Sequence, residues 1–241
     1  MYRIVKKRVL NPTVTMMDIY APLVAKKAKA GQFIILRVDE EGERIPLTVA
    51  GYDRTLGTVK IIFQIVGATT MKLNAKNEGD YIADFCGPLG WATEVEGLKK
   101  VCVVGGGVGC AIALPVAQRL NELGCEVHSV IGFRNKDLVI LEDEFRACSK
   151  SLTIMTDDGS YGRQGVVTSP LKEALDGACV QFVKARETEG EKLRDDLTGK
   201  LDAMKALVEK IEERSPQILS EYRANLEEKV RELVADTQIE E

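Results

Sequence analysis

The stretch that decides the fold is Leu98–Gly124, which reads "LKKVCVVGGGVGCAIALPVAQRLNELG". Its first part is a continuous apolar run, typical of a buried strand, and it passes directly into a group of glycines. Its second part has the apolar spacing of a helix, which Gly124 ends as a C′ residue. A buried strand that leads through glycines into a helix predicts a parallel α/β sheet.

The same alternation continues toward the C-terminus as far as residue 177. Strands are predicted at "CEVHSVIGF" and "SLTIMTDDG", and short helices follow them at "LEDEFRACS" and "SPLKEALDG". Ser169 is expected as the N-cap of the last helix, with Pro170 at its first position. Residues 98–177 therefore predict a nucleotide-binding α/β domain in which helices cover a parallel sheet.

Residues 1–97 have a different pattern, which is that of antiparallel β-structure. The runs "GQFIILRV" and "TVKIIFQIV" alternate and are rich in β-branched residues, and glycine turns separate them. Strands of this kind close naturally into a small barrel. We therefore expect an all-β barrel domain before the α/β domain.

Residues 178–241 change again, to charged sequence with helical periodicity. One apolar stripe runs from Leu193 to Ile211, and a second runs from Leu219 to Leu233. Between them, Ser215 and Pro216 have the order expected for the start of a new helix. The sequence therefore predicts a charged helical hairpin or coiled-coil arm.

Composition limits the classes of function. The net charge of −4 gives no general attraction to nucleic acid or to an anionic membrane. No apolar run has the length of a membrane span and no leader pattern is found, so a cytoplasmic location is expected. The six cysteines lack the spacings of zinc or iron–sulfur ligands. We therefore expect free, mostly buried thiols and no metal site.

Two motifs in the predicted barrel suit a phosphate-bearing ligand. In "RIPLT", Arg44 can clamp a pyrophosphate, Pro46 stiffens the backbone, and Thr48 offers a hydroxyl at the same edge. In "QIVGATT", Gly67–Thr70 allows close backbone approach at an expected helix start. Either motif alone is weak, because an arginine before a turn is usually just solvated. Together they favour a bound phosphate group.

The predicted parallel strands also end in polar, glycine-rich segments. These are Gly105–Gly109, Arg134 and Asp157–Ser160, and open α/β sheets bind ligands at that edge. Cys110 stands where the Rossmann fingerprint has its third glycine, so a tight turn without a ligand is the alternative. The strand ends favour a nucleotide. Asp157 and Asp158 favour NAD, while Arg134 favours NADP, so the choice between the two nucleotides stays open.

The motifs "RIPLT", "FQIVGATT", "GPLG", "CVVGGGVGCA", "GFRNKDLVILEDE" and "TDDGSYGRQGVVT" occur in one order. Over residues 1–177 they resemble the ferredoxin reductase superfamily. Within it they are similar to the small FAD- and NAD-binding subunits of NADH-dependent reduced ferredoxin:NADP oxidoreductase and to the electron-transfer subunit of dihydroorotate dehydrogenase. The resemblance implies an FAD barrel, an NAD(P)(H) domain and a larger flavoprotein or iron–sulfur partner subunit.

The resemblance also implies roles for single residues. It places Arg44 on the FAD pyrophosphate and Thr48 beside the isoalloxazine, where Thr48 is the candidate catalytic residue. Electrons would pass from NAD(P)H through FAD to an iron–sulfur or ferredoxin-type partner. The implied cofactor-binding residues are Arg44, Pro46, Leu47, Thr48, Gly67, Thr69, Thr70, Gly105, Gly106, Gly107, Gly109, Arg134, Asp157, Asp158, Gly159 and Ser160.

The sequence departs from this family after Gly177. The family's further strands, its nicotinamide loop and its [2Fe–2S] ligand segment are not found there, so we expect an incomplete NAD(P) domain and impaired hydride transfer. Residues 180–241 resemble instead the helical arm of the YicC-type endoribonucleases, which suggests a chimeric join near residue 178. The alternative function is a binding or oligomerisation protein with a relic reductase domain. Ribonuclease activity is disfavoured because the acidic arm lacks a catalytic cluster.

The strands missing from the far side of "KVCVVGG" would leave Val101, Val103 and Val104 on an open sheet edge. The arm could fold back over this edge or associate with another chain. We expect self-association, because a helix cannot satisfy the hydrogen bonds of a strand edge. The residues expected at the contact are Leu197, Leu201, Val208, Leu226 and Val230.

Overall fold

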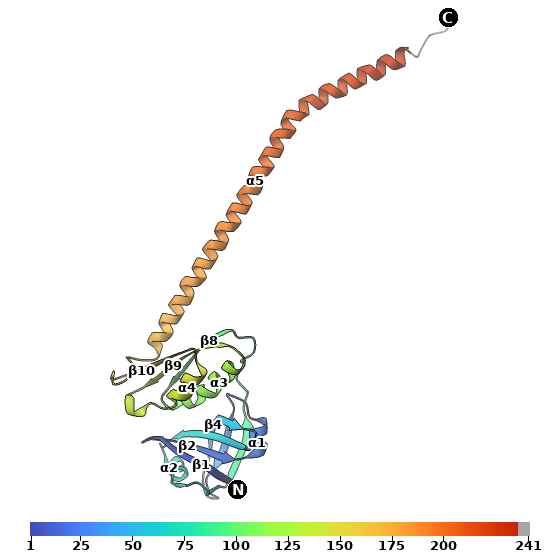
Figure 1. The fold of residues 1–241 in the computed structure, drawn as a ribbon. Coiled ribbons are helices and arrows are strands. Elements are labelled where there is room, and N and C mark those ends of the chain that lie inside the picture. Colours follow the sequence, from blue (N-terminus) through green and yellow to red (C-terminus); the bar gives the residue numbers. More distant parts are fainter. Residues whose placement is uncertain (236–241) are drawn as a thin grey trace. The chain divides into compact units, whose positions relative to one another are not determined.

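The chain forms two compact units, Met1–Leu175 and Asp176–Glu241. They are seen in a computed structural model that describes residues 1–235 (Figure 1). The first unit contains all the strands of the described residues, and the second, as far as residue 235, consists of helix. Each unit has its own physical character and is described by itself.

The first half of unit 1 is an antiparallel barrel, as the sequence predicted. Seven strands pair in the order β6-β1-β2-β5-β4-β3-β7, and every pair is antiparallel. Two short helices, α1 (Pro22–Lys27) and α2 (Ala68–Ala75), connect them. The strands are β1 (Tyr2–Asn11), β2 (Val14–Tyr20), β3 (Phe33–Arg37), β4 (Arg44–Asp53), β5 (Thr58–Gln64), β6 (Tyr81–Ile82) and β7 (Asp84–Leu89).

Alternating side chains fill the barrel. Ile34 and Leu36 of β3 and Ile61 and Phe63 of β5 point into it, and each is at most 2% exposed. Because successive strand residues face opposite sides, the residues between them point out of the barrel. One core cluster therefore belongs to the barrel interior, while the outward face is left for other contacts.

The second half of unit 1 is a four-stranded parallel sheet in the order β11-β10-β9-β8, with α3 (Cys110–Glu122) and α4 (Glu142–Cys148) packed on it. Among residues 1–235, β8 pairs with β9 on one edge and with no strand on the other, as the sequence predicted. The remaining elements are β8 (Lys100–Gly106), β9 (Glu126–Phe133), β10 (Ser151–Thr156), β11 (Arg163–Gln164) and the 3-10 turns η1 (Gly107–Gly109) and η2 (Lys136–Leu138).

The barrel and the parallel sheet share a second core cluster. Val14, Met16, Ala50 and Ile62 of the outward barrel face are buried together with residues of α3, α4, β9 and β10. The side chain of Asn11, at the end of β1, donates to the Leu138 carbonyl at 3.2 Å across the same junction. This packing fixes the outward barrel face against the parallel domain.

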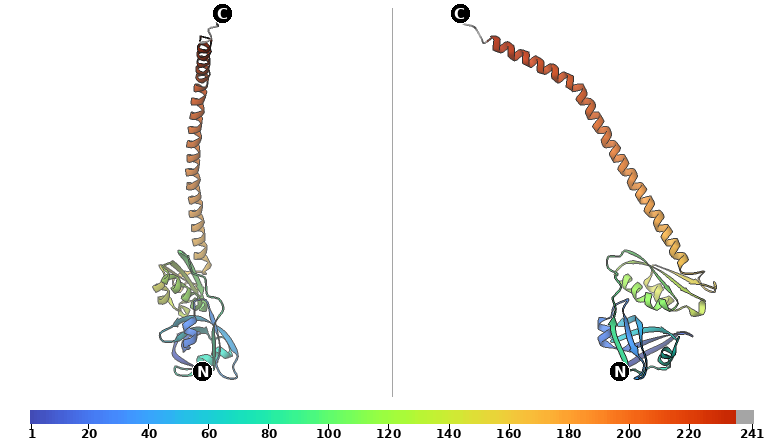
Figure 2. Two further views of the ribbon diagram at one scale, coloured as in Figure 1. Left: turned by 90° about the vertical axis from the view of Figure 1, so that its right-hand side faces the viewer. Right: turned by 180° about the vertical axis from the view of Figure 1, so that it is seen from behind.

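The predicted helical hairpin is wrong. Thr168–Ala235 forms one helix, α5, which continues through both Gly177 and Pro216 (Figures 1 and 2). A proline inside a helix removes one hydrogen bond and kinks the axis, but good helix formers on both sides can carry the helix through it. Arg214 spans the proline by pairing with Glu221 at 2.8 Å, and Figure 1 shows the bend in the orange-red part of α5.

The start of α5 also differs from the expectation. The helix begins at Thr168 rather than after a Ser169 cap, and Gly177 does not end it. An interior glycine costs a helix only about 1 kcal/mol relative to alanine, so strong neighbours can override it. The predicted third helix of the α/β domain and the first helix of the arm are therefore one element.

Two further expectations can be compared with the described residues. Cys110, Cys125 and Cys148 are buried, but Cys86, Cys102 and Cys179 are exposed, so the prediction of mostly buried thiols holds for half of them. No helix within residues 1–235 is both long and apolar enough to span a membrane.

Candidate functional site

A cavity of about 530 Å³ lies at the carboxyl edge of the parallel sheet. Four of the residues predicted from the sequence line it: Gly106 at the end of β8, Gly107 directly after it, Arg134 after β9, and Asp157 after β10. Parallel strands bring their carboxyl ends to one edge, which is why residues about 25 positions apart in the sequence meet here. The structure therefore joins the three predicted strand ends in one site.

The two glycines that line the cavity leave their backbone open to a ligand. A Cβ atom built on Gly106 or Gly107 would have no atom within 4 Å, and Gly107 has a φ of +54° that disfavours a side chain. Gly105 has a different role, because its Cβ would meet the Cα of Cys110 at 3.1 Å. Gly105 thus allows α3 to approach the strand, and Gly109, which does not line the cavity, leads into that helix.

The "TDDGS" segment forms a tight loop of which only Asp157 lines the cavity. The Ser160 hydroxyl donates to Asp158 Oδ1 at 2.6 Å and accepts from the Lys136 amide at 2.8 Å. The hydroxyl and the backbone N–H of Ser160 lower the pKa of Asp158 below its ordinary value. Gly159 takes the turn with a φ of +73°. Asp158, Gly159 and Ser160 therefore hold the loop that positions Asp157.

The barrel contributes polar residues to the cavity that the sequence analysis missed. Gln64 lies at the end of β5, Asn11 at the end of β1, and Thr13 in the turn between β1 and β2. Asn11 Oδ1 accepts from the Thr13 amide at 2.9 Å, which shapes this turn. A polar residue that ends an alternating strand just before "IVGATT" was the available signal for Gln64. Asn11 offered none beyond its place in a turn.

Thr48 lies on the outward face of β4, between Pro46, which is exposed, and Ala50, which is buried in the shared core. Val49 is opposite Ile61, so continuing this register sets Thr48 beside Ile62, and Gln64 is the next outward residue of β5. Thr48 does not line the cavity, but it shares the barrel face whose Gln64 does. Leu47 points the other way, toward the barrel interior.

Arg44 begins β4 beside two other charged side chains. Asp84 Oδ2 accepts from Arg37 Nε at 2.8 Å and from Arg44 Nη2 at 3.1 Å, so one carboxylate orients both arginines. The side chain of Arg44 is still 64% exposed. Its remaining guanidinium donors are therefore available to an anion.

The N-terminus of α2 lies next to this arginine strand. The Thr69 hydroxyl donates to Glu43 Oε2 at 3.3 Å, which links α2 to the residue before Arg44. The Thr70 hydroxyl accepts from the Val66 and Gly67 amides, each at 3.0 Å, so it caps the helix. Gly67 has open space where a Cβ would stand. An arginine, an open glycine and helix-start amides together fit a diphosphate.

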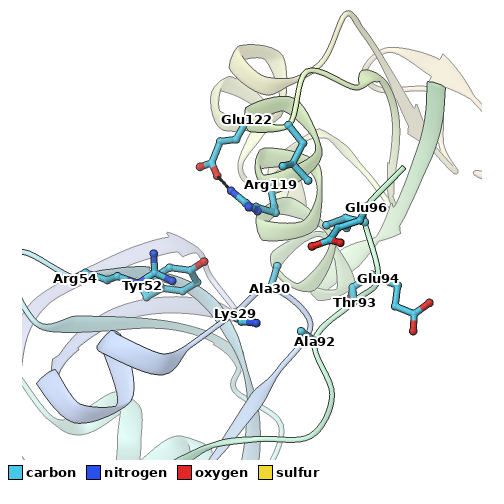
Figure 3. Close-up of a pocket in the computed structure, with 12 residues that line it drawn as sticks. Lys29, Ala30, Tyr52, Arg54, Ala92, Thr93, Glu94, Glu96, Arg119 and Glu122 are labelled. Atoms are coloured by element: carbon cyan, nitrogen blue, oxygen red, sulfur yellow. Dashed lines mark hydrogen bonds and ion pairs between the residues drawn. The ribbon is translucent and has the colours of Figure 1, made fainter. Parts of the chain in front are cut away.

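A second cavity, of about 620 Å³, contains none of the predicted site residues (Figure 3). Lys29, Arg54 and Arg119 line it together with Glu94, Glu96 and Glu122. Figure 3 shows Arg119 paired with Glu122, at 3.0 Å. Because its acidic and basic side chains offset each other, the cavity selects no anion or cation.

No group of three or more His, Cys, Asp or Glu side chains within residues 1–235 is arranged to hold a metal ion. The absence of an iron–sulfur cluster, expected from the cysteine spacings, stays a prediction.

The barrel, the parallel sheet and the cavity at its carboxyl edge define a ferredoxin reductase-like fold. A solved structure of NADH-dependent reduced ferredoxin-NADP oxidoreductase, described for flavin-based electron bifurcation, shares it with a TM-score of 0.69 and 42% identity. That match covers 73% of this chain and 63% of the other. No family model matches the sequence.

Curated relatives carry one recurring name. The dihydroorotate dehydrogenase B (NAD(+)) electron transfer subunit homolog of Thermotoga maritima is 45% identical, over 70% of this chain and 59% of its own length. The dihydroorotate dehydrogenase B (NAD(+)) electron transfer subunit of Enterococcus faecalis is 31% identical, over 73% of this chain and 68% of its own length. The chain therefore belongs to the ferredoxin reductase-like family of dihydroorotate dehydrogenase B electron transfer subunits.

The similarity has two limits. The chain spans about three fifths of the length of the curated relatives that it matches at 45–49% identity. None of the proteins compared above is of the YicC type, and the resemblance of residues 180–241 to the arm of that family is unsupported.

Proposed function

We propose that this chain is an electron-transfer flavoprotein that binds FAD on its barrel and NAD(P)H at the carboxyl edge of its parallel sheet. One observation carries the proposal. Gln64 of the barrel borders the same 530 Å³ cavity as Gly106, Gly107 and Asp157 of the strand ends. A donor and an acceptor placed on these two surfaces would face each other across one space. The names of the relatives support the same chemistry.

We propose that Arg44 and the first amides of α2 hold the FAD diphosphate. Arg44 is oriented by Asp84, and the Thr70 hydroxyl accepts from the Gly67 amide at the start of α2, the end at which a helix presents its first backbone N–H groups. Thr48 would lie beside the isoalloxazine, because it shares the outward barrel face with Gln64. Pro46 keeps this strand stiff, and Leu47 and Thr69 anchor it to the barrel interior and to Glu43. When bound, FAD accepts a hydride and passes electrons on singly.

Gly106 and Gly107 would let the diphosphate of the nicotinamide nucleotide approach the β8–α3 turn, with Arg134 and Asp157 at the sides of the cavity. Between the two nucleotides, we propose NAD(H). Asp157 lines the cavity and Asp158 follows it in the same loop, so this acidic pair disfavours a nearby 2′-phosphate by like-charge repulsion. Comparing flavin reduction by NADH and by NADPH would test the choice, and a preference for NADPH would overturn it.

The proposed acceptor is a larger oxidoreductase subunit carrying flavin or iron–sulfur groups, because the relatives are named as electron transfer subunits. The division into an FAD-binding domain (residues 1–97) and an NAD(P)-binding domain (residues 98–177) follows from the same assignment. A cytoplasmic location and the chimeric join near residue 178 stay predictions.

Replacing Arg44 tests the proposed FAD site. Arg44→Ala removes a charge-assisted contact of about 1.5–3 kcal/mol, so FAD should bind roughly 10- to 150-fold more weakly. The measurement is flavin fluorescence retained after dialysis at graded FAD concentrations. Arg163→Ala is the matched control, because Arg163 is also exposed and ion-paired, with Glu173 at 2.8 Å, but lies on β11.

Equal retention of flavin by the Arg44→Ala variant and the unchanged chain would contradict the role of Arg44. If the unchanged chain bound no FAD at all, the electron-transfer function would fail. The alternative, a binding or oligomerisation protein with a relic reductase domain, would then be favoured.

The impaired hydride transfer expected from the sequence stays a prediction. Flavin reduction by NADH in this chain should be slow, because an error of 1 Å in the position of the nicotinamide can cost about a hundredfold in rate. Stopped-flow absorbance of the flavin would measure it. Reduction as fast as in a full-length relative would show the expectation to be wrong.

A further inference from the structure

The second unit carries an apolar stripe that no other part of the described chain matches in length. From Cys179 to Val230, positions three or four residues apart return to one face of α5. Twelve of these fifteen positions are apolar or cysteine, and the exceptions are Arg186, Gly190 and Ser215. The apolar side chains are Phe182, Leu193, Leu197, Leu201, Met204, Val208, Ile211, Leu219, Tyr222, Leu226 and Val230, each 51–67% exposed.

The stripe is nearly straight. From Cys179 to Val230 the chain advances 51 positions in 14 steps, or about 3.64 residues per step, against 3.6 for a straight helix and 3.5 for a left-handed coiled coil. Phe182, Leu193 and Met204 follow one another at intervals of eleven residues, and so do Ile211 and Tyr222. An eleven-residue repeat keeps a seam almost parallel to the helix axis. Over its whole length the stripe is therefore closer to the period of a straight helix than to that of a heptad repeat, and the coiled coil expected from the sequence stays a prediction.

The stripe also keeps its phase through Pro216. Ile211 and Leu219 stand on either side of the proline, eight residues apart, and both lie on the stripe. A chain that reversed direction at residue 215 would have no reason to keep one face in register across the turn. The periodicity therefore agrees with one continuous helix that presents one continuous face.

We infer that this face of α5 binds the same face of α5 in a second copy of the chain. A stripe of this kind needs a partner about as long, on the order of 77 Å at 1.5 Å per residue. The other α-helices within residues 1–235 have only 6 to 13 residues, so none of them is as long as the stripe. A second copy of the chain does provide a helix of that length.

Charge supports a second copy as the occupant. Residues 179–230 carry ten basic and twelve acidic side chains, interspersed along the helix rather than separated into blocks. Two copies would therefore not repel each other, whereas a strongly charged partner would gain little from such a surface.

The area that the stripe can bury fits a weak dimer, one that dissociates on dilution. Fully burying a side chain of this size removes roughly 60–120 Å² from water, and about half of that is still exposed here. Eleven such side chains amount to on the order of 330–660 Å² per copy, which reaches only the low end of specific interfaces, at about 600 Å² per partner.

The test is the mass of the full chain in solution. Sedimentation velocity over a wide concentration range should show a dimer that dissociates on dilution. Leu201→Glu with Val208→Glu puts two charges into the stripe and should weaken self-association by at least about thirtyfold. Thr188→Glu with Ala206→Glu adds the same charges half a turn away, at exposed positions, and should leave the dimer unchanged.

A third variant guards against simple unfolding of α5. Leu201→Met with Val208→Ile keeps the apolar volume and should remain dimeric, and circular dichroism of all variants reports helix content. A monomer for the unchanged chain at high concentration would overturn the inference and favour an arm that folds on its own chain. The inference would also be overturned if the variant with Leu201→Glu and Val208→Glu stayed dimeric. The same holds if the variant with Thr188→Glu and Ala206→Glu lost the dimer.

Discussion

The two units of this protein use the same apolar residue types in opposite ways. In residues 1–175, leucine, isoleucine and phenylalanine side chains such as Leu36, Ile131 and Phe145 are completely buried. In α5, the large apolar side chains beyond residue 175 are all at least half exposed. The difference lies in the partner. A strand or a short helix finds apolar neighbours within its own unit, while a long single helix has none until another surface covers it.

The largest expected effect separates the two units directly. Phe145→Ala should destabilise unit 1 by about 3–5 kcal/mol, because it empties a fully buried site. Leu201→Ala should change the unfolding of unit 1 by less than about 0.5 kcal/mol, because its side chain is exposed in the single chain. Urea unfolding at low protein concentration measures both. If Leu201→Ala destabilised unit 1 as much as Phe145→Ala does, the contrast between a buried core and an exposed helix face would be wrong.

A smaller effect is expected at the junction inside unit 1. Asn11 is 8% exposed and joins the barrel turn to the Leu138 carbonyl. Asn11→Ala leaves polar partners unpaired and should cost about 1–3 kcal/mol in urea unfolding. Asn11→Asp is the comparison variant: it keeps the acceptor for the Thr13 amide but places a carboxylate oxygen against the Leu138 carbonyl, so it should cost at least as much as Asn11→Ala. If Asn11→Ala were neutral, the junction would depend on apolar packing alone.

The smallest effect is one of pH. Hydrogen bonds from Lys150, His128 and Lys100 hold the pKa of Glu126 at about 2, below its ordinary value of 4.5. A carboxyl group whose pKa is lowered by folding contributes stability above its unfolded pKa and loses it as the pH falls through the folded one. The stability difference between the unchanged chain and Glu126→Gln should thus be constant above about pH 5 and should shrink toward pH 2. A difference that grows on acidification would contradict these contacts.

Much of unit 1 was predictable because its signals are local. Alternation in "TVKIIFQIV" and the continuous apolar run before Gly105 define strands of two kinds, and the chain order of motifs identifies the family. The strand-end residues Gly106, Gly107, Arg134 and Asp157 were predictable too. The rule that parallel strands end at one edge converts positions in the sequence into a place in the fold.

What the sequence could not decide were contacts between distant segments. Asn11 and Gln64 line the cavity because the barrel packs its outward face against α3 and β9, and no local pattern announces that packing. The roles of Asp158 and Ser160 could not be separated from that of Asp157, because only the loop's hydrogen bonds show which side chain faces the cavity.

By itself, then, the sequence determined the strands, the glycine turns, the family and the apolar face of the C-terminal helix, all of which follow from the order of neighbouring residues. The tertiary structure decided that the barrel and the strand ends share one cavity, since this depends on packing between segments more than forty residues apart. It also decided that α5 runs through Pro216. A proline weakens a helix by a fixed local cost, and whether the chain turns there depends on what lies on either side.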